Sequence, residues 1–297
     1  MDGVTRMRTS SRSSGGRTSR AARAALLAPG LVAIGVSFLV PLAWLARMSL
    51  NRTVGSAELQ SAVSPQSYVD VLTDEFVWKI AWQTLQLGVL VTVLAIAVSY
   101  PIALFLARTR SRLRGLLMAL AIAPLLTSSV VRTFGWLTLL SDDGVVNSVL
   151  SGLGVTSEPL TLTNNRTGVV IALVEIMMPY AIIAMIAGFG RVSKDLEDAA
   201  GSLGAGRLRC FLRITFPLSL PGVLTGALMV FVLTISAFVT PRLMGGGRVF
   251  VIATEIFDQA TTTLDWPRAS ALSILLLFLF GVFLVLYQRL FRLVEGR

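Results

Sequence analysis

Six long apolar runs dominate the sequence, and they restrict the chain to folds that exist inside a lipid bilayer. Each run reaches the roughly 20 residues that a helix needs to cross the hydrocarbon core. A helix also satisfies its own backbone amides and carbonyls where no water is present. The sequence therefore predicts an all-α polytopic membrane protein with six transmembrane helices, over residues 24–50, 80–107, 113–140, 167–189, 218–243 and 269–290.

The N-terminal region needs a separate interpretation because a basic tail before an apolar run resembles a signal peptide. Residues 1–23 are rich in Ser, Gly and Arg and are expected to form a disordered cytoplasmic tail. Residues 24–50 are too long for the apolar region of a signal peptide and lack a clear small-x-small cleavage site. We therefore expect an uncleaved first transmembrane helix there.

The distribution of charge supports a membrane protein and predicts its orientation. Only 14% of the residues are charged, against about 25% in soluble domains. Positive residues gather on the cytoplasmic side of membrane proteins, and most of the 26 lysines and arginines lie in the tail, in residues 108–114 and 191–213, and at the C-terminus. Both termini are therefore predicted to be cytoplasmic. This pattern explains the net charge of +10 without a nucleic-acid partner, and the arginines of residues 108–114 are expected to contact lipid headgroups.

Several classes of chemistry are excluded by the residues that the sequence lacks. It has no His and a single cysteine, Cys210, so disulfides, His-based acid–base catalysis and His/Cys metal sites are excluded. A phosphate-binding loop needs a Gly-Lys-Ser/Thr end, and neither lysine, Lys79 or Lys194, has these neighbours. We expect no catalytic residue, no bound cofactor and no metal; if ATP drives the process, another chain binds the ATP.

One polar stretch, residues 193–221, carries a clear helical pattern within a predicted cytoplasmic connection. Ser193 is a plausible N-cap, and Gly204 interrupts the pattern. Two interpretations remain open: a helix lying on the lipid surface, or a helix that lays its apolar face into a groove of a soluble partner. The apolar positions follow i, i+3, i+4 and i+7 spacing, which places them on one helix face: Leu196, Ala199, Ala200 and Leu203.

The same stretch resembles the "EAA" signature of the membrane subunits of bacterial ABC importers, E-A-A-x3-G-x9-I-x-L-P. Here the signature reads Asp198-Ala199-Ala200, then Gly204, then Ile214-Thr215-Phe216-Pro217, with Asp for Glu and Phe for Leu. The resemblance implies a type I importer permease fold, with a transmembrane domain at residues 80–290. It also implies that residues 191–216 form a cytoplasmic coupling segment that docks on a separate ATPase dimer.

Further segments resemble the spermidine/putrescine branch of this family. Residues 132–136, Arg-Thr-Phe-Gly-Trp, are similar to its "RTYAW" segment, and residues 143–147 are similar to its "GLIN" turn. The resemblance implies a bacterial inner-membrane protein that transports a polyamine or a related amine or opine. It also implies a second, homologous permease subunit or a second copy of this chain, and an extracytoplasmic solute-binding protein.

Five residues are candidates for the substrate pathway, and each has a structural alternative. Glu175 is the one acid inside a predicted span, and such acids face a cavity or a partner; it would suit a cationic substrate or pair with an arginine such as Arg132. Arg132 and Trp136 are expected either to contact the docked binding protein or the outer gate, or to belong to an interfacial belt. Tyr180 and Phe238 offer aromatic faces to a cation or pack in the core.

A secondary transporter driven by an ion gradient is the alternative function. Such transporters usually carry several ionisable residues inside the membrane and often an internal repeat. Glu175 stands alone among the acids of the predicted spans, and no clear repeat relates the two halves of the chain. A channel or a purely structural membrane protein would leave the patterned coupling segment unexplained. The sequence therefore favours the importer subunit.

Overall fold

The computed structural model describes residues 20–54, 58–60, 64–190 and 192–295, and most of them are helical. The chain forms two units, Met1–Arg47 and Met48–Arg297. In chain order the elements are α1 (Arg20–Met48), β1 (Arg52–Val54), β2 (Glu58–Gln60), α2 (Gln66–Thr73), α3 (Glu75–Arg108), α4 (Arg114–Ile122), a 3-10 helix (Ala123–Leu126), α5 (Ser129–Leu139), α6 (Val145–Gly152), α7 (Arg166–Phe189), α8 (Lys194–Ser202), α9 (Arg207–Cys210), a π-helix (Phe211–Thr215), α10 (Phe216–Ile235), α11 (Val239–Met244), α12 (Ile252–Thr261) and α13 (Trp266–Glu295).

In the first unit the structure describes the helix α1, which begins earlier than the sequence predicts. The predicted tail ends at residue 23, whereas α1 begins at Arg20; residues 1–19 lie outside the described residues. The first helical residues are Arg and Ala, which have high helix propensity even without an apolar face. From Ala28 to Met48 the helix is long and apolar enough to cross a membrane.

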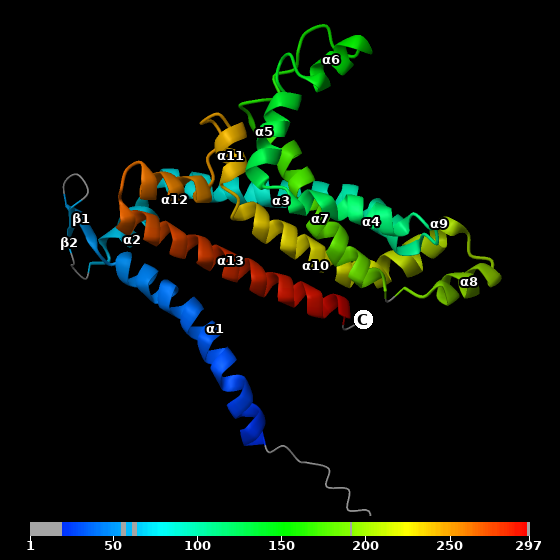
Figure 1. Cartoon of the computed structure of the whole chain (residues 1–297), viewed down its shortest axis with the longest axis horizontal. Helices are drawn as coiled ribbons and strands as arrows, with labels where there is room; N and C mark the ends of the chain where they lie inside the picture. Colours follow the sequence, from blue (N-terminus) through cyan, green and yellow to red (C-terminus); the bar gives the residue numbers. More distant parts are fainter. Residues whose placement is uncertain (1–19, 55–57, 61–63, 191, 296–297) are drawn as a thin grey trace, which may run out of the picture. The chain divides into compact units, whose positions relative to one another are not determined.

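The second unit is built around the helices α3, α7 and α10, which run beside one another in the bundle of Figure 1. Val91 of α3, Ala172 of α7 and Val230 of α10 are fully buried in its core. The helices α7 and α10 approach closely at Gly188 and Gly222, where a Cβ added to Gly222 would lie 2.7 Å from the Cα of Gly188. Small residues permit such close packing of membrane helices.

Four of the six predicted spans agree with the structure, including residues 24–50 at α1, and two differ from it. Among the described residues, five helices are long and apolar enough to cross a membrane, or six if one bent pair counts as a span. The predicted spans 80–107, 167–189 and 269–290 correspond to α3, α7 and α13. The predicted spans 113–140 and 218–243 are not continuous helices.

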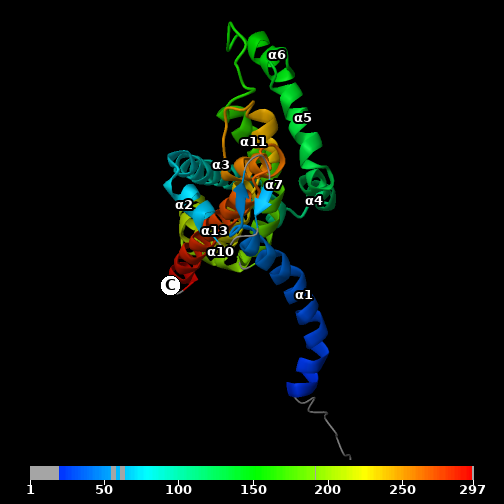
Figure 2. The same ribbon diagram turned by 90° about the vertical axis from the view of Figure 1, so that its left-hand side faces the viewer.

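The third predicted span is broken near its centre. The segment Arg114–Leu126 and the helix α5 meet at an angle of 98°, so that α4 lies along the bundle while α5 and α6 project from it (Figures 1 and 2). Pro124 lacks the N–H that would bond to the Leu120 carbonyl. Ser128 then caps the new helix α5 by accepting a hydrogen bond from the backbone N–H of Val130 at 3.3 Å.

The fifth predicted span ends earlier than residue 243. The helix α10 stops at Ile235, residues 236–238 are not helical, and the chain resumes a helix as α11. Pro241 has no N–H for the carbonyl of Ala237, so a single helix could not continue through it without losing a hydrogen bond. The apolar composition continues across the break, which is why hydropathy alone does not detect it.

The connections between the predicted spans at residues 51–79, 141–166 and 244–268 contain structure of their own. They hold the short helices α2, α6 and α12 and the β1–β2 hairpin, in which Arg52 pairs with Gln60. This hairpin of two three-residue strands is the β-structure of the described residues, so the prediction of an all-α fold holds for the membrane part. Asp74, the N-cap of α3, accepts a hydrogen bond from Arg268 of α13 at 2.5 Å, which ties the starts of these two helices together.

Candidate functional site

The patterned polar stretch forms the helix α8, which begins where the sequence predicts. The hydroxyl of Ser193 accepts a hydrogen bond from the backbone N–H of Asp195 at 3.1 Å, so Ser193 is the N-cap. Asp195 and Glu197 lie in the first turn, where the helix dipole favours negative charge. The N-cap prediction is therefore confirmed.

Gly204 ends this helix in a way that explains the glycine of the signature. Its φ is +81°, a left-handed conformation that glycine adopts without a steric cost. The N–H of Gly204 bonds to the Gly201 carbonyl at 2.9 Å, and the N–H of Ala205 bonds to the Ala200 carbonyl at 3.0 Å. These two bonds form a Schellman motif, which satisfies the last carbonyls of the helix. The signature thus encodes a helix of fixed length.

The apolar side chains of α8 face outward from the chain. Leu196 is 47% exposed and Leu203 is 89% exposed; Asp198 and Ala199 are exposed, and Ala200 is half-buried. We call Leu196, Ala199, Ala200 and Leu203 the docking face. Apart from the half-buried Ala200, it is an apolar surface that the described residues leave uncovered.

The second half of the signature belongs to the start of a membrane helix rather than to the docking face. The π-helix Phe211–Thr215 runs directly into α10, and the N–H of Phe216 bonds to the Phe211 carbonyl. Pro217 cannot donate to the Arg213 carbonyl, so a wider turn just before it avoids the loss of a regular helical bond. Within this region Ile214 is half-buried and Pro217 is exposed.

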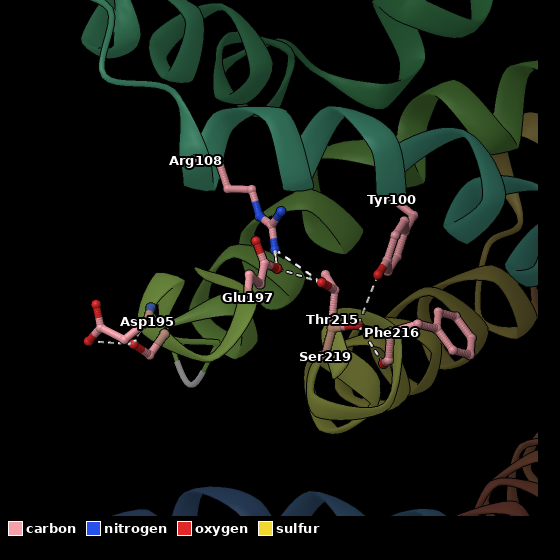
Figure 3. Close-up of polar contacts among 8 residues, drawn as sticks. Tyr100, Arg108, Asp195, Glu197, Thr215, Phe216 and Ser219 are labelled. Carbon is pink, nitrogen blue, oxygen red and sulfur yellow. Dashed lines mark hydrogen bonds and ion pairs between the residues drawn. The ribbon is translucent and has the colours of Figure 1, made fainter. Parts of the chain in front are cut away.

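Figure 3 shows a cluster of polar side chains between α8, the end of α3 and the start of α10. Arg108, the last residue of α3, forms an ion pair with Glu197 of α8. Thr215, the last residue of the π-helix, donates a hydrogen bond to the same carboxylate oxygen at 2.5 Å. The guanidinium of Arg108 also donates to the Thr215 hydroxyl at 3.3 Å. We call Arg108, Glu197 and Thr215 the clamp, because they join three elements at one carboxylate.

A pocket of about 330 Å³ lies where the two broken spans meet. Thr127 and Ser129 line it from the first break, and Ser236 and Phe238 line it from the second. The helix α7 closes it with Leu173, Ile176, Met177 and Tyr180. Interrupted membrane helices are common at binding sites, because they expose polar backbone groups to a cavity.

The predicted pathway residues gather in and beside this pocket. Arg132, Tyr180 and Phe238 line it. Glu175 and Trp136 do not line the pocket, but they form contacts next to it. Arg132 forms an ion pair with Glu175 at 3.5 Å, and the indole N–H of Trp136 donates a hydrogen bond to the other oxygen of the Glu175 carboxylate at 3.2 Å. The alternative in which Glu175 pairs with Arg132 therefore describes the observed geometry. The pair leaves the pocket wall without a net charge at this point.

A second polar contact fixes the two restarting helices against each other. The hydroxyls of Thr133 in α5 and Thr240 in α11 are 3.0 Å apart, and both residues are buried. The Thr133 hydroxyl also donates to the Ser129 carbonyl at 2.8 Å, so Thr240 is the donor in the contact between them. The outer wall of the pocket is thus held together by a hydrogen bond between parts of the chain far apart in sequence.

Two features of the site were missed by the sequence interpretation. Pro124 and Pro241, each close to serines and threonines, could have indicated the helix breaks. The sequence interpretation instead placed both prolines inside continuous spans. Glu197 had no signal beyond its place in the acidic first turn, because its partners are distant in the sequence. The clamp and the pocket wall therefore come from the structure.

Comparison with known proteins identifies the class of protein that this fold and site define. The family model described as "Binding-protein-dependent transport system inner membrane component" matches residues 99–297. The spermidine/putrescine transport system permease protein PotB of Escherichia coli (strain K12) is 32% identical over 269 residues, which are 91% of this chain and 93% of PotB. The molybdenum transport system permease protein ModB of Azotobacter vinelandii is 31% identical over 209 residues, 69% of this chain and 90% of ModB.

Solved structures share the fold at lower identity. A bacterial ABC transporter involved in the import of the acidic polysaccharide alginate matches with a TM-score of 0.72 and 19% identity, over 90% of this chain and 94% of that chain. The MetNI methionine ABC transporter matches with a TM-score of 0.57 and 15% identity, over 75% of this chain and 99% of that chain. The protein is thus a multi-pass helical permease of the inner membrane. It belongs to the family of binding-protein-dependent transport system inner membrane components and is a permease subunit of an ABC importer.

Proposed function

We propose that the chain forms, together with a second permease subunit, the membrane path for a polyamine such as spermidine or putrescine. An extracytoplasmic binding protein delivers the substrate, and a dimer of separate ATPase chains binds ATP and supplies the energy. The observation that carries the proposal is the docking face of α8, an exposed apolar surface on a helix of fixed length outside the membrane spans. An amphipathic helix of this kind suits a groove in a partner protein.

The sidedness of the proposal is supported by the arrangement of the basic segments. The helices α8 and α9 lie at the end of the bundle where α3 ends (Figure 1). That end carries the arginines of residues 108–114 and of α9, and positive residues favour the cytoplasmic side. Both termini would then be cytoplasmic, as would the surface offered to the ATPase.

The proposed dock uses the first half of the signature. Leu196, Ala199, Ala200 and Leu203 would enter the groove of the ATPase, and Asp198 would lie beside them. Gly204 sets the length of the inserted helix, while Ile214 and Pro217 shape the return into the membrane. Closure of the ATPase dimer would then move α8 as a rigid body and change the accessibility of the path.

We infer a polyamine substrate from the similarity to PotB, and the lining of the pocket is compatible with a polyamine. Tyr180 and Phe238 can present aromatic faces to an ammonium group, and the hydroxyls of the lining can accept its hydrogen bonds. The helix α10 ends at the pocket, and the carbonyls at a helix C-terminus favour a cation. Because Glu175 balances the charge of Arg132, the pocket does not repel a cation outright. The relative ModB belongs to a molybdenum transport system; an oxyanion such as molybdate would favour an arginine without a counter-charge.

The docking part of the proposal is tested by placing one positive charge on the docking face. Ala200→Arg should weaken co-purification of the ATPase by about fivefold or more, because an unpaired charge buried in an interface costs at least about 1 kcal/mol. Gly201→Arg is the matched control, since Gly201 lies off the apolar face and has open space around it. Full ATPase assembly and uptake with Ala200→Arg would contradict the dock.

The energy source and the substrate are tested together in proteoliposomes that contain the whole complex. Uptake of labelled spermidine should require ATP inside the cytoplasmic compartment and the binding protein outside, and unlabelled putrescine should compete while molybdate should not. Uptake that survives the removal of ATP but stops when ionophores dissipate the ion gradients would instead favour the secondary transporter.

A further inference from the structure

Glu197 lies on α8 but outside the docking face, and its side chain turns toward the membrane helices. At 100° per residue it stands about a quarter turn from the centre of the apolar face. Its side chain is only 19% exposed, whereas its partner Arg108 is 34% exposed. Asp195 occupies the other flank of the apolar face at a similar angle and is exposed. Two acids of one helix thus differ in what they contact.

The clamp brings three separate elements to one carboxylate. Glu197 belongs to α8, Arg108 ends α3, and Thr215 ends the π-helix that leads into α10 (Figure 3). Thr215 is 1% exposed, and charge-assisted hydrogen bonds of this kind are stronger than neutral ones. The contact is therefore stronger than an ion pair exposed to solvent.

The connection that follows α8 would not by itself transmit a movement. It consists of Gly204, Ala205 and Gly206. A Cβ at Gly204 or Gly206 would meet nothing within 4 Å, so this connection packs against little at both glycines. With only this connection, α8 could tilt on a bound partner while α10 stayed in place.

The clamp, in contrast, leads directly to the pocket. The helix α10 runs without interruption from Phe216 to Ile235, and the next residue, Ser236, lines the pocket. A second contact, from the hydroxyl of Tyr100 in α3 to that of Ser219 in α10 at 3.0 Å, ties the two membrane helices together one turn beyond the clamp. A continuous helix of 20 residues is a rigid connection of about 30 Å.

We propose that Glu197 is a positioning residue that makes α3 and α10 follow the movement of α8, so that the ATP cycle changes the access to the pocket. This proposal rests on the proposed function, because it requires an ATPase docked on α8. It assigns to Glu197 a role separate from docking: the docking face binds the ATPase, and the clamp passes its movement on. Loss of the clamp therefore uncouples ATP hydrolysis from the pocket without releasing the ATPase.

The experiment measures access to the pocket without needing to know the substrate. Cys210 is the only cysteine, so Cys210→Ser with Ser236→Cys places a single thiol at the pocket. The assembled complex, with its ATPase and second permease subunit, is labelled with a membrane-impermeant maleimide in the presence and absence of ATP and vanadate. The labelling rate should change by about fivefold with nucleotide, within the range of known coupling effects between sites.

Glu197→Ala in this background should keep the bound ATPase and its ATP hydrolysis but lose the nucleotide-dependent change in labelling. Asp195→Ala is the matched control on the other side of the docking face. It should keep the bound ATPase, the ATP hydrolysis and the nucleotide-dependent change in labelling. Arg108→Glu should behave as Glu197→Ala does, and the double exchange Arg108→Glu with Glu197→Arg should restore a nucleotide-dependent change, since either order of charges can form the ion pair.

Two results would overturn the proposal while leaving the proposed function intact. One is a nucleotide-dependent change in labelling that is as large in Glu197→Ala as in the parent protein. The other is loss of the ATPase from Glu197→Ala, with no rescue by the double exchange, which would make Glu197 a residue of docking or folding. Failure of the parent protein itself to bind any ATPase would instead overturn the proposed function.

Discussion

An interrupted helix lies near each end of α10, but the side chains around the two interruptions point in opposite directions. At the α8 end, Gly204 ends the helix α8. The apolar side chains of this helix face outward, while the carboxylate of Glu197 turns inward to the clamp. At the pocket end, the spans break near Pro124 and Pro241, and hydroxyl and aromatic side chains turn inward around a cavity. An interrupted helix can thus produce a surface for a protein or a cavity for a solute, depending on which side chains it turns inward.

The two ends are joined by the crossing of α7 and α10, so the largest effect is expected from a change there. Gly222→Leu places a side chain against the backbone of Gly188, where even a Cβ would lie 2.7 Å from a Cα. The helices must move apart, at a cost of about 3 kcal/mol or more. We expect a strongly reduced melting temperature in detergent and loss of both ATPase binding and uptake. Gly281→Ala is the control, because a Cβ at Gly281 meets nothing within 4 Å; an unchanged melting temperature in Gly222→Leu would contradict the close crossing.

A change at Gly204 should disturb the α8 end alone. Its φ of +81° is a conformation that valine strongly disfavours, and forcing such a residue into it costs about 1–3 kcal/mol. Gly204→Val should therefore reduce ATPase co-purification several-fold while the melting temperature of the membrane bundle stays close to that of the parent protein. Gly204→Asn should be milder, because asparagine tolerates this conformation. Equal losses in both variants would show that the glycine matters for contact rather than for conformation.

The sequence predicts the continuous membrane helices well but does not predict where two of the spans are broken. Apolar content is a local property, so α3, α7 and α13 were found close to their observed bounds. Proline is not decisive in the same way: Pro101 and Pro179 lie inside the continuous helices α3 and α7, whereas the spans containing Pro124 and Pro241 are broken. Whether a helix tolerates the backbone hydrogen bond that proline removes depends on the neighbouring helices. The residues around each proline do not show which helices these are.

The site shows the same division between local and distant information. The N-cap Ser193, the apolar periodicity of α8 and the stop at Gly204 are local, and the sequence predicted all three. The ion pair of the clamp joins Arg108 and Glu197, which are 89 positions apart. A single sequence does not indicate which of several acids an arginine will meet, since that depends on how the helices pack.

A smaller effect, confined to the pocket end, is expected from the contact between α5 and α11. Thr240→Val removes the donor of the buried bond to Thr133 while keeping the shape of the side chain. A net loss of about 1 kcal/mol is expected for one such hydrogen bond, seen as a melting temperature lower by a few degrees. Uptake should fall modestly, and ATPase co-purification should not change. A loss of ATPase binding in Thr240→Val would show that the two ends are not separable in this way.

The smallest effect tests whether charge at the pocket matters to transport. Glu175→Gln leaves Arg132 without its counter-charge, so the wall of the pocket gains one positive charge. The pair is separated by 3.5 Å and Glu175 is 32% exposed, and a pair of this kind contributes only about 0–1 kcal/mol. We therefore expect the KM for spermidine to rise by at most about fivefold. The ATP hydrolysis rate should not change, because the clamp and the pocket lie at opposite ends of α10.

Trp136→Phe is the matched variant, since it removes the hydrogen bond from the indole N–H to Glu175 but keeps the charge. If charge is what matters, Trp136→Phe should leave the KM nearly unchanged while Glu175→Gln raises it for a polyamine. Equal effects in the two variants would mean that Glu175 acts by positioning α5 against α7. Unchanged uptake and substrate preference in Glu175→Gln would remove the carboxylate from the pathway altogether, and the pocket would then discriminate by its shape, hydroxyls and aromatic rings. In that outcome the α8 end would depend on the charge of the half-buried Glu197, while the pocket end would not depend on that of Glu175.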